Sequence, residues 1–123
     1  MPSKRPEVPL KAIRDNILLA QAFVEGFNLR TFRADARTIY AVTRCLEIIS
    51  EASRRLPASV KSRHPNIPWK EIAGAGNVYR HDYEDVSTAM IWNTVKALPP
   101  LLAAVELEQS SPKAKPAKAK NPK

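Results

Sequence analysis

Hydrophobic residues recur at intervals of three and four positions through most of the chain, which is the spacing of one buried face on an α-helix. A first stripe runs from residue 9 to about residue 26 and comprises Leu10, Ile13, Ile17, Ala20, Val24 and Phe27. Gly26 can supply the left-handed residue that ends such a helix. The spacing therefore predicts one amphipathic helix over these positions.

A second stripe predicts a single long helix from about residue 31 to residue 56, with Thr31 as its N-cap and Pro57 as its end. Its members are Phe32, Ala36, Ile39, Val42, Leu46, Ile49 and Leu56, with Ser53 as the polar interruption. Arg33, Arg37 and Arg44 lie on another face and are expected to form surface ion pairs, with Glu47 and Glu51 placed for Arg44 and Arg55. Cys45, beside the stripe, is predicted to be a small buried hydrophobe rather than a nucleophile.

A third helix follows a proline-containing connector over residues 57–67 and begins near Pro68, because proline is tolerated in a first helical turn. Its apolar residues are Trp69, Ile72, Val78 and Tyr79. Gly74 and Gly76 lie inside it, and each costs about 1 kcal/mol relative to alanine. They predict a local reason for glycine, such as close approach of another backbone or a ligand.

The fourth predicted helix runs from about residue 87 to residue 108, with Ser87 or Asp85 as its cap. Its stripe comprises Ile91, Val95, Leu98, Leu102 and Val105. Pro99 and Pro100 should kink it, because an interior proline removes a backbone donor. No segment alternates like a strand, so the fold class is all-α, an antiparallel bundle of four to five helices with a kinked C-terminal helix.

Composition narrows the class of protein. The chain has 123 residues, 44% of them hydrophobic and 26% charged, which is typical of one globular domain. We expect a helical domain over residues 1–108 and a disordered tail over residues 109–123, which hold five lysines and three prolines. No apolar stretch is long enough to cross a bilayer, and no signal segment is evident, so a cytoplasmic protein with no membrane contact is expected.

Charge is distributed unevenly. Lys and Arg number 20 against 12 Asp and Glu, for a net charge of +8. Besides the tail, the segment between Arg54 and His81 holds six basic residues and one acid, Glu71. Such an excess can attract polyanions, or it can be a solvated basic loop beside a solubilising tail. Both interpretations remain open at this point.

The segment from Gly76 to residue 86 gathers one of the two histidines, two of the three tyrosines, an arginine and three acids. Asn77 and His81 share a helix face if the helix extends that far. An imidazole can transfer protons near neutral pH, so His81 is a candidate acid–base residue. The alternative is a histidine that caps or packs at a helix end, and His64 in the connector is a weaker candidate.

Several kinds of site are absent from the sequence. There is no spacing of metal ligands, no glycine-rich phosphate loop and no nucleophilic triad, and we expect no bound metal or cofactor. Cleavage of RNA fits these limits, because it needs a base for the 2′-hydroxyl and a donor for the phosphate oxygens. His81 is the candidate base, and Arg80, Lys70 and the Asn77 amide are candidates for holding phosphate.

Three segments together resemble the HepT-like minimal toxins of the HEPN superfamily, over about residues 10–105. They are LEIISEASRRLP, PNIPWKEIAGAGNVYRHDYEDV, and the last helix around an Ile-Trp pair. The resemblance implies an all-α bundle that forms a homodimer, pairs with a minimal nucleotidyltransferase antitoxin and cleaves RNA without a metal ion. The resemblance thus implies that the chain is the toxin of a type VII-like toxin–antitoxin module.

The family motif is Arg-Asn, three residues, then His-x-Tyr, and in this sequence Asn77, His81 and Tyr83 match it. Gly76 occupies the place of the arginine, so the phosphate would fall to Arg80 and Lys70. By resemblance, His81 and Asn77 are the catalytic residues and Tyr83 accepts AMP from the antitoxin. Tyr83 can instead be an aromatic residue packed on a tryptophan at the helix end.

Two hypotheses of different classes follow. In the first, the chain is a dimeric endoribonuclease with His81 in a cleft between the subunits. In the second, Gly76 marks lost activity, and the chain is a HEPN-fold binding subunit that docks a nucleotidyltransferase, nucleic acid or both. A third is a basic helical adaptor with no relation to toxins.

Overall fold

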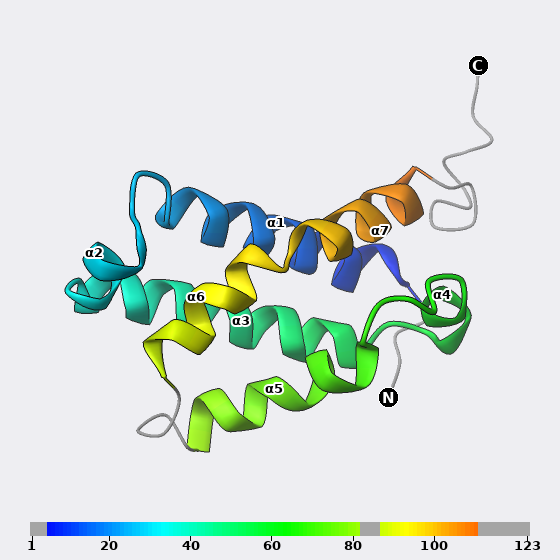
Figure 1. Ribbon diagram of the computed structural model, residues 1–123. Helices are drawn as coiled ribbons and strands as arrows, with labels where there is room; N and C mark the ends of the chain where they lie inside the picture. Colours follow the sequence, from blue (N-terminus) through cyan, green and yellow to red (C-terminus); the bar gives the residue numbers. More distant parts are fainter. Residues whose placement is uncertain (1–4, 82–86, 111–123) are drawn as a thin grey trace.

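The structure consists of helices joined by short connections (Figure 1). The computed structural model describes residues 5–81 and 87–110, and for residues 78–81 it describes the backbone only. In chain order the helices are α1 (Glu7–Phe23), α2 (Leu29–Arg33), α3 (Ala36–Arg54), α4 (Ala58–Ser62), α5 (Trp69–His81), α6 (Thr88–Lys96) and α7 (Pro99–Gln109). The described part of the chain contains no strand, so the all-α prediction is confirmed.

Helix α3 is the centre of the bundle. It packs against α1 on one side and α5 on another, and both neighbours run antiparallel to it (Figure 1). Helices α6 and α7 follow one another across the bundle, where α6 contacts α2 and α3 and α7 contacts α1. The short helices α2 and α4 lie at opposite ends of α3. The bundle therefore has an α2 end, where α5 finishes, and an α4 end, where α7 finishes.

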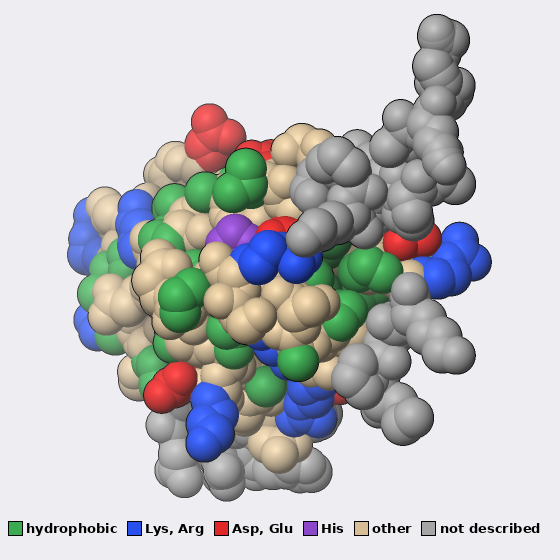
Figure 2. All heavy atoms as spheres, turned by 90° about the vertical axis from the view of Figure 1, so that its right-hand side faces the viewer, with side chains coloured by type: hydrophobic (Ala, Val, Ile, Leu, Met, Phe, Trp, Pro, Cys, Tyr) green, Lys and Arg blue, Asp and Glu red, His purple; other side chains and the backbone are tan. Residues whose placement is uncertain are grey.

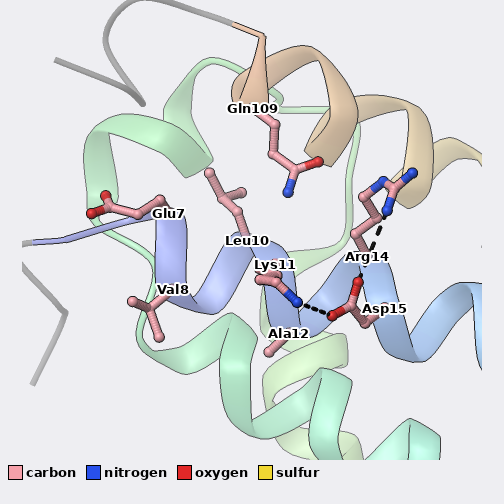
Figure 3. A pocket seen from close by; sticks show the side chains of 8 residues that line it. All are labelled: Glu7, Val8, Leu10, Lys11, Ala12, Arg14, Asp15 and Gln109. Carbon is pink, nitrogen blue, oxygen red and sulfur yellow. Dashed lines mark hydrogen bonds and ion pairs between the residues drawn. The ribbon is translucent and has the colours of Figure 1, made fainter. Parts of the chain in front are cut away.

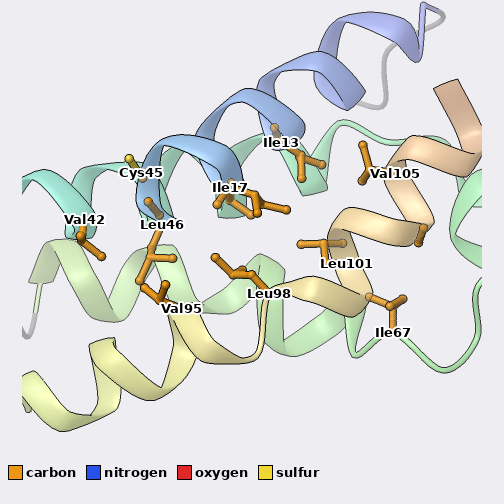
Figure 4. Close-up of a cluster of buried hydrophobic side chains, with 14 of the residues drawn as sticks. Ile13, Ile17, Val42, Cys45, Leu46, Ile67, Val95, Leu98, Leu101 and Val105 are labelled. Carbon is orange, nitrogen blue, oxygen red and sulfur yellow. The ribbon is translucent and has the colours of Figure 1, made fainter. Parts of the chain in front are cut away.

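The core lies where α1, α3, α6 and α7 meet (Figure 4). The predicted stripe of α1 is confirmed, since Leu10, Ile13, Ile17 and Ala20 are fully buried. From α3 the core takes Val42, Cys45, Leu46 and Ile49, and from α6 and α7 it takes Ile91, Val95, Leu101 and Val105. Burial of these side chains is the main favourable contribution to stability.

Two local predictions around the first helix and the core are confirmed. Gly26 has a φ of +85°, the left-handed conformation that ends the α1 region at little cost for glycine. Cys45 is 4% exposed, and burial raises the pKa of its thiol. The thiol is thus kept in its neutral form, which is the weaker nucleophile.

The predicted single helix from residue 31 to residue 56 is wrong, because the chain forms α2 and α3 there with a break at Ala34 and Asp35. Thr31 is not an N-cap. Asn28 caps α2 by accepting a hydrogen bond from the Thr31 N–H at 2.9 Å, and the Thr31 hydroxyl accepts from the Asn28 N–H. Asp35 starts α3 by accepting from the Thr38 N–H at 3.0 Å. Two strong capping residues outweigh a continuous apolar stripe.

The break also changes which side chains of the second stripe are buried. Phe32 is fully buried and its ring lies 5.3 Å from that of Trp92, whereas Ala36 is exposed.

The expected surface ion pair of Arg44 with Glu47 on α3 is confirmed at 3.1 Å. Glu51 pairs with Arg54 at 3.9 Å rather than with Arg55, which is the C-cap and lies just after the last residue of α3.

The C-terminal prediction is partly wrong in the same way. Ser87 caps α6 as predicted, accepting a hydrogen bond from the Met90 N–H at 2.9 Å, while the alternative cap Asp85 lies outside the described residues. The two prolines end one helix and begin another instead of bending a single helix. Proline needs no backbone donor in a first turn, so Pro99 and Pro100 fit the start of α7.

The connector over residues 57–67 contains α4, which the sequence did not predict. Trp69, the first residue of α5, holds the end of this connector, because its indole N–H donates to the backbone oxygens of Lys61 at 3.1 Å and His64 at 3.0 Å. None of the helices in the described ranges is long and apolar enough to cross a membrane. The predicted tail lies almost entirely outside the described residues.

Candidate functional site

Helix α5 runs without interruption from Trp69 to His81. The condition for placing Asn77 and His81 on one helix face is therefore met, because residues four apart lie one above the other. Asn77 is exposed. The side chains of Arg80 and His81 and the whole of Tyr83 lie outside the described structure, and so does the proposed packing of Tyr83 on Trp92. The end of α5 is thus the candidate site, at the α2 end of the bundle (Figure 1).

Gly76, which stands in the place of the motif arginine, is buried against α3. Its N–H donates to the Ser50 hydroxyl at 3.0 Å, and that hydroxyl donates to the Ala73 carbonyl at 3.0 Å. Ser50 is 1% exposed. Arg54 also donates from Nε to the Ala73 oxygen at 3.0 Å. These bonds set the position of α5 on α3 one turn before the candidate catalytic residues.

The two glycines of α5 have different surroundings. Gly76 has a close neighbour in α3, since the Ser50 hydroxyl accepts from its N–H, but this neighbour is a side chain rather than the backbone or ligand that was expected. Gly74 is exposed, and a Cβ added there would meet nothing within 4 Å. The same prediction is therefore wrong for Gly74, where helix packing does not require glycine.

Lys70 lies in the first turn of α5 and is exposed. Eleven residues separate it from His81, which is about 16 Å along the helix axis. The structure therefore does not bring Lys70 to the end of α5 within one chain. A lysine at this distance can meet a different phosphate of a long RNA strand but not the one beside His81.

Arginines gather at the α2 end, close to where α5 finishes. Arg30 and Arg33 belong to α2, Arg37 belongs to the first turn of α3, and all three are exposed. Within the described ranges, none of the three makes a hydrogen bond or an ion pair. Their charges remain available to an anion, and the expectation that Arg33 and Arg37 form surface ion pairs is wrong within the described ranges.

Comparison with known proteins adds an independent line of support. A family model described as "Ribonuclease HepT-like" matches residues 13–107, which include the whole of α5. The chain belongs to this HepT-like ribonuclease family of the HEPN superfamily. The resemblance deduced from the sequence is thereby confirmed.

Among related HepT-like proteins, one from Thermococcus cleftensis named "Probable ribonuclease HepT" is 39% identical over 87 residues, which are 71% of this chain and 79% of that protein. A candidate RNase from Caldanaerobacter subterraneus is 39% identical over 79 residues, covering 63% of this chain and 70% of the relative. A candidate RNase from Methanocaldococcus jannaschii is 35% identical over 86 residues, 69% of this chain and 79% of its own length. No solved structure matches the chain.

The α4 end of the HepT-like bundle contains a charge cluster that the sequence reasoning missed. The Glu108 side chain in α7 is 5% exposed. Arg63 donates to its carboxylate at 2.7 Å and 3.0 Å, and His64 Nε2 lies 2.7 Å from Oε2. Arg63, and to a lesser degree His64, lower the pKa of Glu108, and burial opposes them. Figure 2 shows this end, with a histidine beside basic and acidic side chains.

A signal for this cluster was present in the sequence. Glu108 follows Val105 by three positions and Leu101 by seven, so it continues the apolar face of α7. A carboxylate on a buried face needs a partner from elsewhere in the fold. His64, the weaker of the two histidine candidates, therefore belongs to a structural contact.

Hollows in the described surface lie away from the end of α5. One of about 860 Å³ is formed by the start of α1 and the last residue of α7 (Figure 3). Its charges neutralise each other, since Asp15 pairs with Lys11 at 2.6 Å and with Arg14 at 3.9 Å. Another, of about 550 Å³, is mostly apolar and lies between α3, α5 and the α6–α7 junction. Neither concentrates positive charge, and the described residues contain no cluster of metal-ligating side chains.

Proposed function

We propose that this chain is the toxin of a type VII-like toxin–antitoxin module, a cytoplasmic endoribonuclease that acts as a homodimer without a metal ion. His81 is its acid–base residue and Asn77 orients the RNA. Arg80 holds the phosphate that is attacked, and Lys70 contacts the strand further along. The two copies of the motif face each other across the dimer axis.

The chemistry assigned to His81 is an internal transfer at phosphorus. The imidazole takes the proton of a 2′-hydroxyl, whose oxygen forms a bond to the adjacent phosphorus. The bond from phosphorus to the 5′-oxygen breaks, and that oxygen takes a proton from the imidazolium of the same or the partner chain. The products are a 2′,3′-cyclic phosphate and a free 5′-hydroxyl.

One observation chiefly supports this proposal. The HepT-like match spans the motif. Because α5 stays helical through Asn77 to His81, these two residues, four positions apart, lie on the same face of the helix. The names of the relatives supply the reaction class, since they are ribonucleases or candidate RNases. The exposed arginines at the same end of the bundle suit a polyanionic substrate.

Control of the toxin is assigned to Tyr83 and a minimal nucleotidyltransferase antitoxin. The tyrosine hydroxyl would lose its proton to water, and its oxygen would form a bond to the α-phosphorus of ATP while pyrophosphate leaves. The added AMP places a negative charge two residues from His81 and repels the RNA backbone. A mass increase of one AMP on the wild-type chain, absent from Tyr83→Phe, would support this assignment. An unmodified Tyr83 in a complex that does form would contradict it.

The test of the activity compares the wild type with His81→Ala, each expressed without an antitoxin. We expect growth arrest and fragments ending in cyclic phosphate for the wild type, and neither for His81→Ala. Both purified proteins should unfold at the same denaturant concentration, which shows that the difference is chemical. If neither protein arrests growth and the RNA stays intact in both cultures, the proposal is contradicted.

The buried position of Gly76 favours a second candidate function, that of a HEPN-fold subunit that binds a nucleotidyltransferase or nucleic acid without cleaving it. Loss of a charged transition-state donor commonly lowers a rate by about 10² to 10³. The variant Gly76→Arg distinguishes the two when cleavage is measured per folded molecule. Faster cleavage by Gly76→Arg than by the wild type favours an enzyme slowed by the missing cation. No cleavage by the wild type or by Gly76→Arg favours the binding subunit.

A further inference from the structure

Tyr40 is the most exposed large hydrophobic side chain among the described residues, at 72%. It belongs to the second turn of α3, a helix whose opposite face forms the core through Val42, Leu46 and Ile49. Single exposed hydrophobic residues are common on protein surfaces and need no explanation by themselves. The neighbours of Tyr40 distinguish it from the other exposed hydrophobic residues of the chain.

Arginines flank Tyr40 along the outer face of α3. Arg37 precedes it by three positions and Arg44 follows it by four, so all three side chains leave the helix on the same side. Arg37 makes no hydrogen bond or ion pair within the described ranges, and Arg44 is 70% exposed while it contacts Glu47 at 3.1 Å. Arg33, at the end of α2, adds a further exposed cation before Arg37. We call Arg33, Arg37, Tyr40 and Arg44 the α3 platform.

The packing of α3 against α5 locates the platform relative to the candidate site. Ser50 contacts Gly76, and the two helices run antiparallel (Figure 1). Tyr40 lies about 15 Å before Ser50 along the axis of α3, and the end of α5 lies about 7 Å beyond Gly76 along the axis of α5. Tyr40 therefore lies roughly 8 Å beyond the end of α5, turned about 80° round α3 from the side that meets α5.

We propose that the α3 platform binds single-stranded RNA, with a base stacked on Tyr40 and the flanking phosphates contacted by Arg33 and Arg37. Exposed aromatic rings and guanidinium groups together are the chemistry that recognises unpaired bases, whereas duplex RNA hides its bases. The proposal rests on the proposed ribonuclease function for its choice of RNA. It adds the path of the strand, which leaves the end of α5 along the outer face of α3.

Binding is tested in a chain that carries His81→Ala, so that cleavage does not remove the probe. The probe is a short fluorescent uridine oligomer, and a duplex RNA of the same length is the comparison. Tyr40→Leu should weaken binding of the oligomer about 5- to 150-fold, because stacking contributes about 1–3 kcal/mol per base, and Tyr40→Phe should retain it. Duplex binding should change less than threefold in both variants.

Matched control variants show whether the loss of binding is specific to the ring and charge of the α3 platform. Each control removes an exposed ring or a charge elsewhere in the molecule. Phe23→Leu removes an exposed ring from α1, and Arg5→Gln removes one charge at the other end of the bundle. Arg37→Gln should reduce the slope of log affinity against log salt by about 0.7, whereas Arg5→Gln should change it little. Thermal unfolding should be the same for all these variants.

Unchanged affinity of Tyr40→Leu for the oligomer would overturn the proposal. If the assembly of that variant also had a lower molecular mass, the platform would be a contact between protein chains instead. If Tyr40→Leu weakens binding but the wild type cleaves no RNA, RNA binding by the α3 platform is supported and the proposed ribonuclease function is contradicted.

Discussion

The two ends of the bundle use positive charge in opposite ways. At the α4 end, Arg63 and His64 both contact the buried carboxylate of Glu108, which fastens α7 to the connector before α5. At the α2 end, Arg33 and Arg37 are exposed and make no ion pair within the described ranges. Basic residues at the first end contribute to the fold, and those at the second remain available for a ligand.

This difference explains why charge along the sequence was a poor guide to the site. The excess between Arg54 and His81 suggested either a polyanion-binding segment or a solvated loop. In the structure, Arg54 donates to the Ala73 carbonyl and Arg63 to Glu108, so part of that excess is internal to the fold. Exposed arginines without an ion pair within the described ranges lie outside that segment, on α2 and the start of α3.

The largest difference between the ends should appear when the buried carboxylate is neutralised. Glu108→Gln should lower the free energy of unfolding by about 2–3 kcal/mol, because the buried side chain loses its charge-assisted hydrogen bonds to Arg63 and His64. Glu106→Gln is the matched control, since its contact with Arg14 at 3.3 Å is exposed and should contribute less than about 1 kcal/mol. Urea denaturation measures both. Equal effects would show that the α4 end is no more structural than the exposed surface.

A smaller effect is expected where α5 is fastened to α3. Ser50→Ala should cost about 1–2 kcal/mol, because the buried Gly76 N–H loses its hydroxyl partner. Amide hydrogen exchange at Gly76 should become faster, and RNA cleavage should fall as the end of α5 loses its fixed position. Ser62→Ala, which removes an exposed hydroxyl bonded to Ser59, should change stability by less than about 0.5 kcal/mol. An unchanged exchange rate at Gly76 would contradict this role of Ser50.

The smallest expected effect is the pH dependence of the α4 end. The pKa of Glu108 is lowered from 4.5 by Arg63 and His64, so its contribution to stability is complete above that value and is lost as the pH falls through the lower folded pKa. The stability difference between wild type and Glu108→Gln should therefore shrink below pH 4.5. Urea titrations at several acidic pH values measure it. A difference that stays constant down to strongly acidic pH would argue against the charged contact.

Elements that depend on near neighbours in sequence were predicted well. The stripe of α1, the left-handed Gly26 and the Ser87 cap all follow from residues a few positions apart. The break before α3 was missed because the apolar stripe was given more weight than Asn28 and Asp35. Capping groups at such a point satisfy backbone donors that a continuous helix would satisfy itself.

Features that join distant parts of the chain were not predicted. Glu108 meets residues 44 and 45 positions away, and Ser50 meets Gly76 across 26 positions. Local periodicity contains no information on such pairs. The candidate catalytic residues came from the motif, since proton transfer by His81 has no signature in hydrophobic spacing. The phosphate-binding role of Lys70 stays a prediction, and because α5 separates Lys70 from His81 by about three turns, the two residues of one chain would meet different phosphates.

The burial of Cys45 has a practical consequence for measuring the RNA path. The chain has one cysteine, and that thiol is 4% exposed with a raised pKa. It should react slowly with maleimides and other thiol reagents. A cysteine introduced at an outward position of α3 would then be the preferred attachment point for a fluorophore or a photocrosslinker, with the native residue left in place.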